Sequence, residues 1–215
     1  LPLSVLNTTQ ETEKCIYEHG ASKKNDIEYL TKISQPDLTA LLNVSEAHME
    51  SFKNMKNLTL TKEEIFSHPR TKHVILNMDD VNFIRWKKLN DNKKITTLSL
   101  KENADYVMRN DSENYHVSTS YGDFNINKDI TKNILPINIL FSIAITMESG
   151  SSTHDVINGL QLFSGIEGRF YTFYSKNKSM VIDDSYNANP ESMKSALRQL
   201  ASYRKTRIFV MGDMG

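Results

Sequence analysis

The chain has 215 residues, with 26 lysine and arginine residues against 26 aspartate and glutamate residues and a single cysteine. The balanced charge excludes a general attraction to nucleic acid or to an anionic membrane, and Cys15 alone excludes a disulfide within the chain. The longest apolar stretch, residues 134–145, is interrupted by Pro136 and Asn138 and is shorter than the roughly 20 residues that span a bilayer. No signal peptide precedes Leu1, so we expect a cytoplasmic protein.

The N-terminal part of the chain predicts strands that alternate with helices. Residues 14–17 have the composition of a short strand that ends before Glu18, and residues 38–42 have that of a buried strand. Apolar side chains recur at helical spacing in residues 26–33, and a further helix is predicted over residues 58–66. This alternation is typical of a parallel sheet with crossover helices, in which ligands bind beyond the carboxyl ends of the strands.

The pattern changes towards the middle of the chain. A strand is predicted at residues 73–77 and an amphipathic segment at residues 83–89. Short strands with polar turns follow in residues 94–130, and two helices are expected at residues 134–148 and 153–162. The predicted fold class is therefore α/β, a parallel-sheet domain with a β appendage.

A second domain is predicted to begin after Glu167. A new series of strand, turn, helix and strand starts there and ends in an apolar strand-like run at residues 207–213. The sequence therefore divides into domains at residues 1–167 and 168–215. Because the chain lacks an initiator methionine and stops at Gly215, we expect it to be a fragment of a longer protein.

Three residues near the predicted strand ends could carry chemistry. Glu18 could hold a divalent cation through a carboxylate oxygen, although a lone acid at a strand end is more often simply solvated. His48 and Lys62 lie downstream, and each taken alone is more often structural or solvated. Their combination near successive strand ends of one sheet favours a functional site.

A polar turn follows the predicted strand near residue 182. Residues 183–193 read DDSYNANPESM, and Pro190 suits the first position of a helix. A capped turn explains Pro190 and one amide or acid, but it leaves the rest of the run unexplained. The acid suits a pair of ribose hydroxyls and the amides suit polar edges of a ligand. Arg169 could reach a phosphate as a planar fork of donors, or could form an ordinary interdomain salt bridge.

These segments resemble the Mur ligase family, and the DDSYNANPESM run resembles the branch that adds D-alanyl-D-alanine. Other segments agree in order, namely EHGA at residues 18–21, residues 43–50, KEEIF at residues 62–66, Gly168-Arg169 and VMGDM at residues 210–214. The resemblance implies a central ATPase domain of Mur ligase type, without its phosphate loop, at residues 1–167. It also implies the first half of a Rossmann-like C-terminal domain at residues 168–215.

The resemblance implies an ATP-dependent amide ligase of peptidoglycan synthesis. ATP would activate a carboxylate of UDP-N-acetylmuramoyl-tripeptide as an acyl phosphate, and the amine of D-alanyl-D-alanine would attack it. Glu18 and His48 resemble ligands of two magnesium ions, and Lys62 resembles a lysine that carbon dioxide converts to a carbamate. These small-molecule substrates, no nucleic acid or membrane partner, and a monomer are expected.

The resemblance also implies a nucleotide site. Arg169 resembles the arginine that reaches the γ-phosphate, Asp184 the acid that binds the ribose, and Asn138 a contact to the adenine. The remaining residues implied to line this side of the cleft are Tyr186, Asn187 and Asn189.

Several positions depart from the family pattern. Ser22-Lys23 and Asn25 stand where Asn-His and a glycine are usual, Lys53 replaces a glycine, and residues 135–137 replace a Gly-x-His run. No Gly-x-x-x-x-Gly-Lys-Ser/Thr phosphate loop occurs in the 215 residues. The chain alone is therefore not expected to catalyse ligation.

Two alternatives stay open. The first is a related amide ligase that takes another amino acid, against which the DDSYNANPESM run argues. The second is a degenerate or truncated paralogue that binds nucleotide without ligation, which the departures favour.

Overall fold

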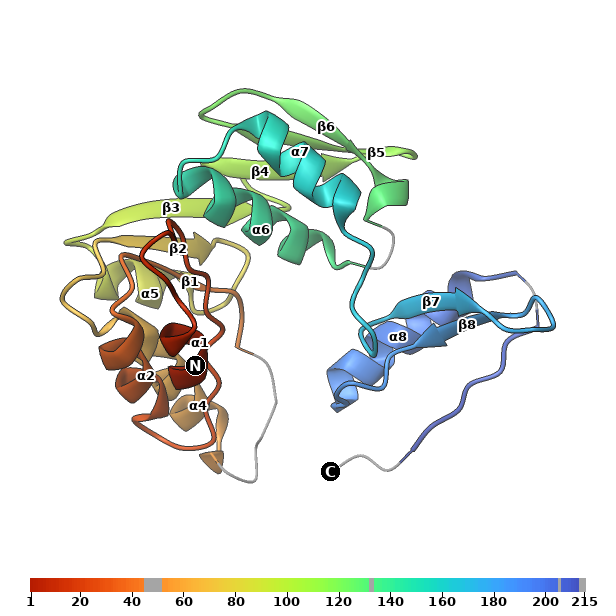
Figure 1. The fold of residues 1–215 in the computed structure, drawn as a ribbon, viewed down its shortest axis with the longest axis horizontal. Helices are drawn as coiled ribbons and strands as arrows, with labels where there is room; N and C mark the ends of the chain where they lie inside the picture. Colours follow the sequence, from red (N-terminus) through yellow and green to blue (C-terminus); the bar gives the residue numbers. More distant parts are fainter. Residues whose placement is uncertain (45–51, 132–133, 205, 213–215) are drawn as a thin grey trace. The chain divides into compact units, whose positions relative to one another are not determined.

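The computed structural model describes residues 1–44, 52–131, 134–204 and 206–212, and it divides the chain into two compact units. The first unit contains the described residues up to Gln161, and the second contains those from Leu162 onward. Figure 1 shows the course of the chain through each unit. Each unit is described separately below.

The first unit is built on one six-stranded sheet whose strands lie in sequence order (Figure 1). The first four strands are parallel and the last two are antiparallel. The predicted strands at residues 38–42 and 73–77 are confirmed, and the strands of residues 94–130 continue the same sheet. The strands are β1 Leu38–Leu41, β2 His73–Asn77, β3 Lys94–Ser99, β4 Tyr106–Asn110, β5 Asn114–Thr119 and β6 Phe124–Asn127.

The helices of this unit follow the predicted order, with ends that differ by a few residues. None of the helices in the described ranges is both long enough and apolar enough to cross a membrane. The helical elements are α1 Pro2–Leu6, α2 Asp26–Ser34, α4 Met55–Glu63, the 3₁₀ turn η1 Glu64–Phe66, α5 Phe83–Leu89, the 3₁₀ turn η2 Lys128–Ile130, α6 Pro136–Glu148 and α7 Thr153–Leu162.

Strand β2 is buried on both of its faces. Successive side chains of a strand point to opposite faces, so Val74 and Leu76 pack into one apolar cluster with Trp86 of α5. Ile75 packs into the other cluster, which contains most of the buried side chains of α6. Helices therefore cover both faces of the parallel part of the sheet, as the α/β prediction requires.

Two predicted strands are wrong within the described residues. Residues 14–17 form no strand, and Ile16, their one aliphatic side chain, is 76% exposed. Residues 207–212 also form no strand, and Ile208 is 81% exposed. A strand is stable only when its backbone pairs with a neighbour, and neither segment pairs with β1 or with the sheet of the second unit.

The second unit contains a hairpin and a helix. Strands β7 Tyr171–Tyr174 and β8 Met180–Asp183 pair in antiparallel fashion, with Tyr171 opposite Asp183. Helix α8 Pro190–Ser202 follows, and Pro190 stands at its first position as predicted. The polar run of residues 183–189 therefore connects a strand to a helix.

Candidate functional site

Lys62 lies in the last turn of α4, between two buried residues. The helix begins at Asn54, whose side chain accepts a hydrogen bond from the Asn57 amide at 2.9 Å. Thr61 is 1% exposed and Glu63 is 9% exposed, whereas Lys62 is half-buried. Lys62 thus stands at the border between the core and the surface.

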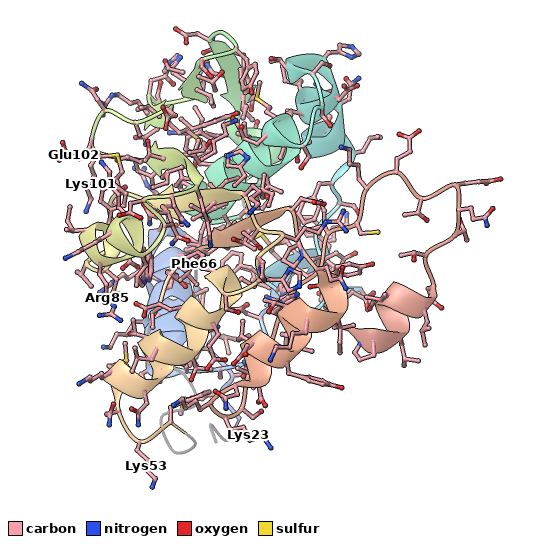
Figure 2. All side chains as sticks on the ribbon, turned by 90° about the vertical axis from the view of Figure 1, so that its left-hand side faces the viewer. Lys23, Lys53, Phe66, Arg85, Lys101 and Glu102 are labelled. Atoms are coloured by element: carbon pink, nitrogen blue, oxygen red, sulfur yellow. The ribbon has the colours of Figure 1, made fainter. Side chains whose placement is uncertain are left out.

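Glu63 connects α4 to α5. Its carboxylate accepts two hydrogen bonds from Arg85, from Nε at 2.6 Å and Nη2 at 2.8 Å, and one from Trp86 Nε1 at 3.1 Å. Figure 2 shows Arg85 below α5 as drawn. The hydrogen bond and the charge of Glu63 raise the pKa of the Arg85 guanidinium. This buried acid is therefore compensated by three donors of one neighbouring helix.

Glu64 connects the same turn to α2. Its two oxygens accept hydrogen bonds from the backbone amides of Asn25 at 2.8 Å and Glu28 at 3.2 Å. The first amides of a helix have no partner within the helix, so Glu64 satisfies them from a distant part of the chain. Glu63 and Glu64 thus have partners on other helices, and no hydrogen bond or ion pair to the Lys62 side chain is found among the described residues.

The other predicted residues of the first unit are not joined to Lys62. Glu18 is exposed in a segment without helix or strand, so the predicted position at a strand end is wrong. Asn138 lies in the first turn of α6 and is half-buried. His48 lies outside the described residues. Among the described residues, no hydrogen bond or ion pair links Glu18, Lys62 and Asn138, and no group of three or more His, Cys, Asp or Glu side chains could hold a metal ion.

In the second unit, three predicted residues lie together. The backbone carbonyl of Gly168 accepts a hydrogen bond from the Tyr186 amide at 2.9 Å, and Asp184 Oδ1 accepts one from the Phe170 amide at 3.0 Å. The guanidinium carbon of Arg169 lies 4.1 Å from the centroid of the Tyr186 ring. Arg169, Asp184 and Tyr186 therefore form one exposed cluster, in which an aromatic ring supports the cation.

This cluster requires glycine at position 168. Gly168 has a φ of +76°, and a Cβ there would lie 3.2 Å from both the backbone nitrogen and the Cβ of Tyr186. Because one of these contacts is with backbone, a side chain at this position would push the two segments apart. Gly168 thus allows the backbone to approach Tyr186 closely, and the next residue, Arg169, places its guanidinium on the Tyr186 ring.

The two amides of the turn have different surroundings. Asn189 Oδ1 accepts a hydrogen bond from the Ser192 amide at 2.9 Å and caps α8, directly before Pro190. Asn187 is exposed, and its Oδ1 accepts a hydrogen bond from the adjacent Ala188 amide at 2.9 Å. Both oxygens thus have local structural partners, and Asn187 is the more open to a ligand.

The structure explains three departures from the family pattern. Asn25 and Lys53 replace usual glycines, and both have a left-handed backbone, with φ of 71° and 66°. Asparagine tolerates this conformation, whereas a lysine there costs roughly 1 kcal/mol or more. Figure 2 shows Lys53 extending outward from the start of α4. Pro136 begins α6, a position where proline is favourable.

The residues present fit the groups that the resemblance implies, with one condition. A guanidinium that lies on a ring can still donate from its edge to phosphate oxygens, and Asp184 keeps a second carboxylate oxygen for a hydroxyl. Magnesium prefers oxygen ligands, which Glu18 offers directly. The ammonium of Lys62 would repel the ion, so Lys62 fits only as a carbamate.

Sequence reasoning missed the residues that surround Lys62. The Glu63–Arg85 pair spans 22 positions and the Glu64–Asn25 pair spans 39. No local pattern connects residues so far apart. The only available signal was the pair of acids directly after Lys62, which a solvated helix face explains equally well.

Comparisons with known proteins point to one family. The family model for the Mur ligase middle domain matches residues 1–146, and the model for the Mur ligase, glutamate ligase domain matches residues 168–215. The UDP-N-acetylmuramoyl-tripeptide--D-alanyl-D-alanine ligase of Escherichia coli (strain K12) is 27% identical over 225 residues, which cover 100% of this chain and 49% of that protein.

Solved structures agree with this family. MurF from Acinetobacter baumannii has a TM-score of 0.86 at 26% identity, over 98% of this chain and 47% of that one. MurF ligase from Thermotoga maritima, in complex with ADP, has a TM-score of 0.74 at 26% identity, over 93% and 47% of the two chains. The chain thus spans about half the length of the curated relatives it matches.

Proposed function

Since the chain belongs to the Mur ligase family, we propose that it forms the central part of an ATP-dependent ligase that joins D-alanyl-D-alanine to UDP-N-acetylmuramoyl-tripeptide. The observation that carries the proposal is the contact of Arg169 with Tyr186, beside Asp184, on the DDSYNANPESM turn. It brings a cation from the segment before β7 to an acid and an aromatic ring in the connection between β8 and α8. The names of the relatives supply the substrates.

Residues of the second unit, together with Asn138 of the first unit, would bind the nucleotide. When bound, ATP would activate the substrate carboxylate as an acyl phosphate. Arg169 would offset the charge that develops on the transferred phosphoryl group. Asp184 would accept hydrogen bonds from the ribose hydroxyls, Asn138 would contact the adenine, and Tyr186, Asn187 and Asn189 would line the same side.

The residues of the first unit would hold the metal ions. The neutral Lys62 amine would attack carbon dioxide, forming a nitrogen–carbon bond and releasing one proton, and the carbamate would present two oxygens. Glu18, His48 and this carbamate would hold a pair of magnesium ions. Magnesium, when bound, would offset the repulsion between the phosphate and the substrate carboxylate.

We extend the proposal to the organisation of the protein. Residues 1–167 would form the central domain and residues 168–215 the start of the C-terminal domain, in a cytoplasmic monomer with small-molecule substrates.

The test measures phosphate release by the full open reading frame that encodes this chain. Release from ATP should require both UDP-N-acetylmuramoyl-tripeptide and D-alanyl-D-alanine. Lys62→Ala should abolish it, whereas Lys56→Ala, an exposed lysine on the same helix, should leave it within twofold. Phosphate release when one of the two substrates is left out, or full activity in Lys62→Ala, would contradict the proposal.

A degenerate paralogue is the second candidate. The lysine in a left-handed conformation at position 53, where the family usually has glycine, favours it. A folded protein that binds ATP but releases no phosphate with any amine would establish it. Release with a different amine would instead identify a related ligase.

A further inference from the structure

We propose that Glu63 and Glu64 are positioning residues for Lys62, and that Glu63 acts through Arg85. The inference depends on the proposed role of Lys62 in the ligase. It concerns how one turn of α4 is fixed on two sides, so that the Lys62 side chain leaves the helix in a constant direction.

The first restraint sets the rotation of the turn. Consecutive helical residues project about 100° apart, so the direction of Glu63 determines that of Lys62. Two parallel hydrogen bonds from Arg85, at 2.6 and 2.8 Å, fix the plane of the Glu63 carboxylate. Trp86, which is fully buried, adds the third donor at 3.1 Å.

The second restraint prevents the end of α4 from fraying. Helix ends are normally loose because their last carbonyls lack partners. Here the chain continues directly into η1, and Glu64 binds the amides of Asn25 and Glu28. Lys93 Nζ then donates to the carbonyl of Phe66 at 2.5 Å, which closes the far end of η1.

The two restraints also commit the neighbouring acids to other helices. Glu63 binds α5 and Glu64 binds α2, so both carboxylates fix the turn that carries Lys62.

The experiment compares Arg85→Gln with Arg70→Gln in the protein made from the full reading frame. Arg70 forms a similar two-pronged pair with Asp37, at 2.7 and 3.3 Å, on an exposed surface of the same unit. Carbamate at Lys62 is measured by ¹³C NMR in ¹³C-bicarbonate, and kcat and KM are measured by phosphate release. We expect Arg85→Gln to lower the carbamate occupancy and kcat roughly 10- to 100-fold, and to leave KM for ATP within about twofold of the parent value. In Arg70→Gln, all three quantities should stay within about twofold of the parent values.

Two further variants test whether orientation is responsible. Arg85→Lys, which keeps the charge but offers no planar fork, should give intermediate values. Trp86→Phe removes the third donor, together with part of a fully buried side chain. It should lower kcat by severalfold, and it keeps the test available if Arg85→Gln does not fold. Equal kcat and carbamate occupancy in Arg85→Gln and Arg70→Gln would overturn the proposal.

Failure of the ligase proposal gives a different result. The parent protein would then release no phosphate that depends on both substrates. In that case the ¹³C linewidths and order of the Lys62 side chain still test its positioning. They should show greater mobility in Arg85→Gln than in Arg70→Gln, and equal mobility would reject the role of Glu63.

Discussion

The turn that carries Lys62 and the turn that carries Asp184 are stabilised by different kinds of contact. The first is fixed by buried or half-buried carboxylates that reach other helices, 22 to 39 positions away. The second is fixed by hydrogen bonds from backbone amides to partners at most 18 positions away, by the close approach at Gly168, and by the exposed guanidinium of Arg169 on the Tyr186 ring. All the buried apolar side chains of the described residues lie in the first unit.

The difference shows where each unit is vulnerable. The first unit has two apolar clusters, so it should tolerate the loss of one polar contact. The described part of the second unit has no buried apolar side chain, so its stability should depend more on the backbone geometry of its turns. The predictions below test this contrast, beginning with the largest expected effect.

Gly168→Ala should destabilise the second unit by about 2–4 kcal/mol, because it adds a steric clash with Tyr186 to a left-handed backbone. Hydrogen exchange of the β7 and β8 amides would measure the loss. Gly165→Ala is the matched control, since Gly165 also has a positive φ of +90° but its Cβ would meet only side-chain atoms of Tyr171, at 3.4 and 3.9 Å. The contrast fails if both variants exchange alike, or if the amides of β2 in the first unit lose protection to the same extent.

Glu148→Gln should destabilise the first unit by about 2 kcal/mol at pH 7, because the carboxylate accepts hydrogen bonds from Lys94 at 2.6 Å and Tyr106 at 3.0 Å. Burial raises the pKa of Glu148, but these two bonds, with the charges of Lys94 and His73, outweigh burial and leave the pKa below its ordinary value. The parent's advantage should therefore be present above about pH 4.5 and disappear as the pH falls through the folded pKa. Urea unfolding of both proteins across this range checks the sign, and a constant difference would contradict it.

Lys53→Gly should stabilise the first unit by about 0.5–1 kcal/mol, because it relieves a left-handed lysine. Lys56→Gly, inside α4, should destabilise by a similar amount, since glycine is a poor helix former. The midpoints of urea unfolding should therefore move in opposite directions. A shift of both in the same direction would show that the backbone at Lys53 is not strained.

The smallest effect is expected at the β4–β5 hairpin. Asn125 and then Asp111 raise the pKa of His116, while the amides of Asn114 and Glu113, together with His116, lower the pKa of Asp111 to about 2. The His116 contribution is lost as the pH rises through its raised pKa, and the Asp111 contribution is lost as the pH falls towards 2. The pair thus supports the hairpin best between roughly pH 4 and 6.5.

An NMR titration of the imidazole checks this pair. The pKa of His116 should lie above its ordinary value and should fall part of the way back in Asp111→Asn, since Asn125 still binds the ring. An unchanged pKa in that variant would show that Asp111 does not act on His116.

Features that depend on local sequence were predicted, whereas contacts between distant residues were not. Strand β2 and helix α7 were predicted to the residue, because periodicity and Pro/Gly signals are local. The resemblance implied that Arg169, Asp184 and Tyr186 belong to one nucleotide site with Asn138, Asn187 and Asn189, but the contact of Arg169 with the Tyr186 ring was not predicted. The partners of Glu63 and Glu64 were not predicted either, because they lie on other helices.

The two wrong strands have the same physical origin. Residues 14–17 and 207–212 have strand-like composition, but composition does not supply a neighbouring strand. Glu18 was consequently placed at a strand end that does not exist among the described residues. The departures at Asn25 and Lys53 were visible in the sequence, but only the backbone angles showed that both conserve the left-handed geometry of a glycine.

The capping of α2 by Glu64 has a consequence for synthesis on the ribosome. The amides of Asn25 and Glu28 bind the Glu64 carboxylate, which lies 39 and 36 positions further along the chain and is therefore synthesised later. At ordinary translation speeds this segment takes roughly 2 to 8 seconds to emerge. An isolated helix of nine residues is marginal in water, so α2 should remain largely unformed on the nascent chain. It should become stable only when α4 and η1 have left the exit tunnel, which makes these three elements a single step of co-translational folding.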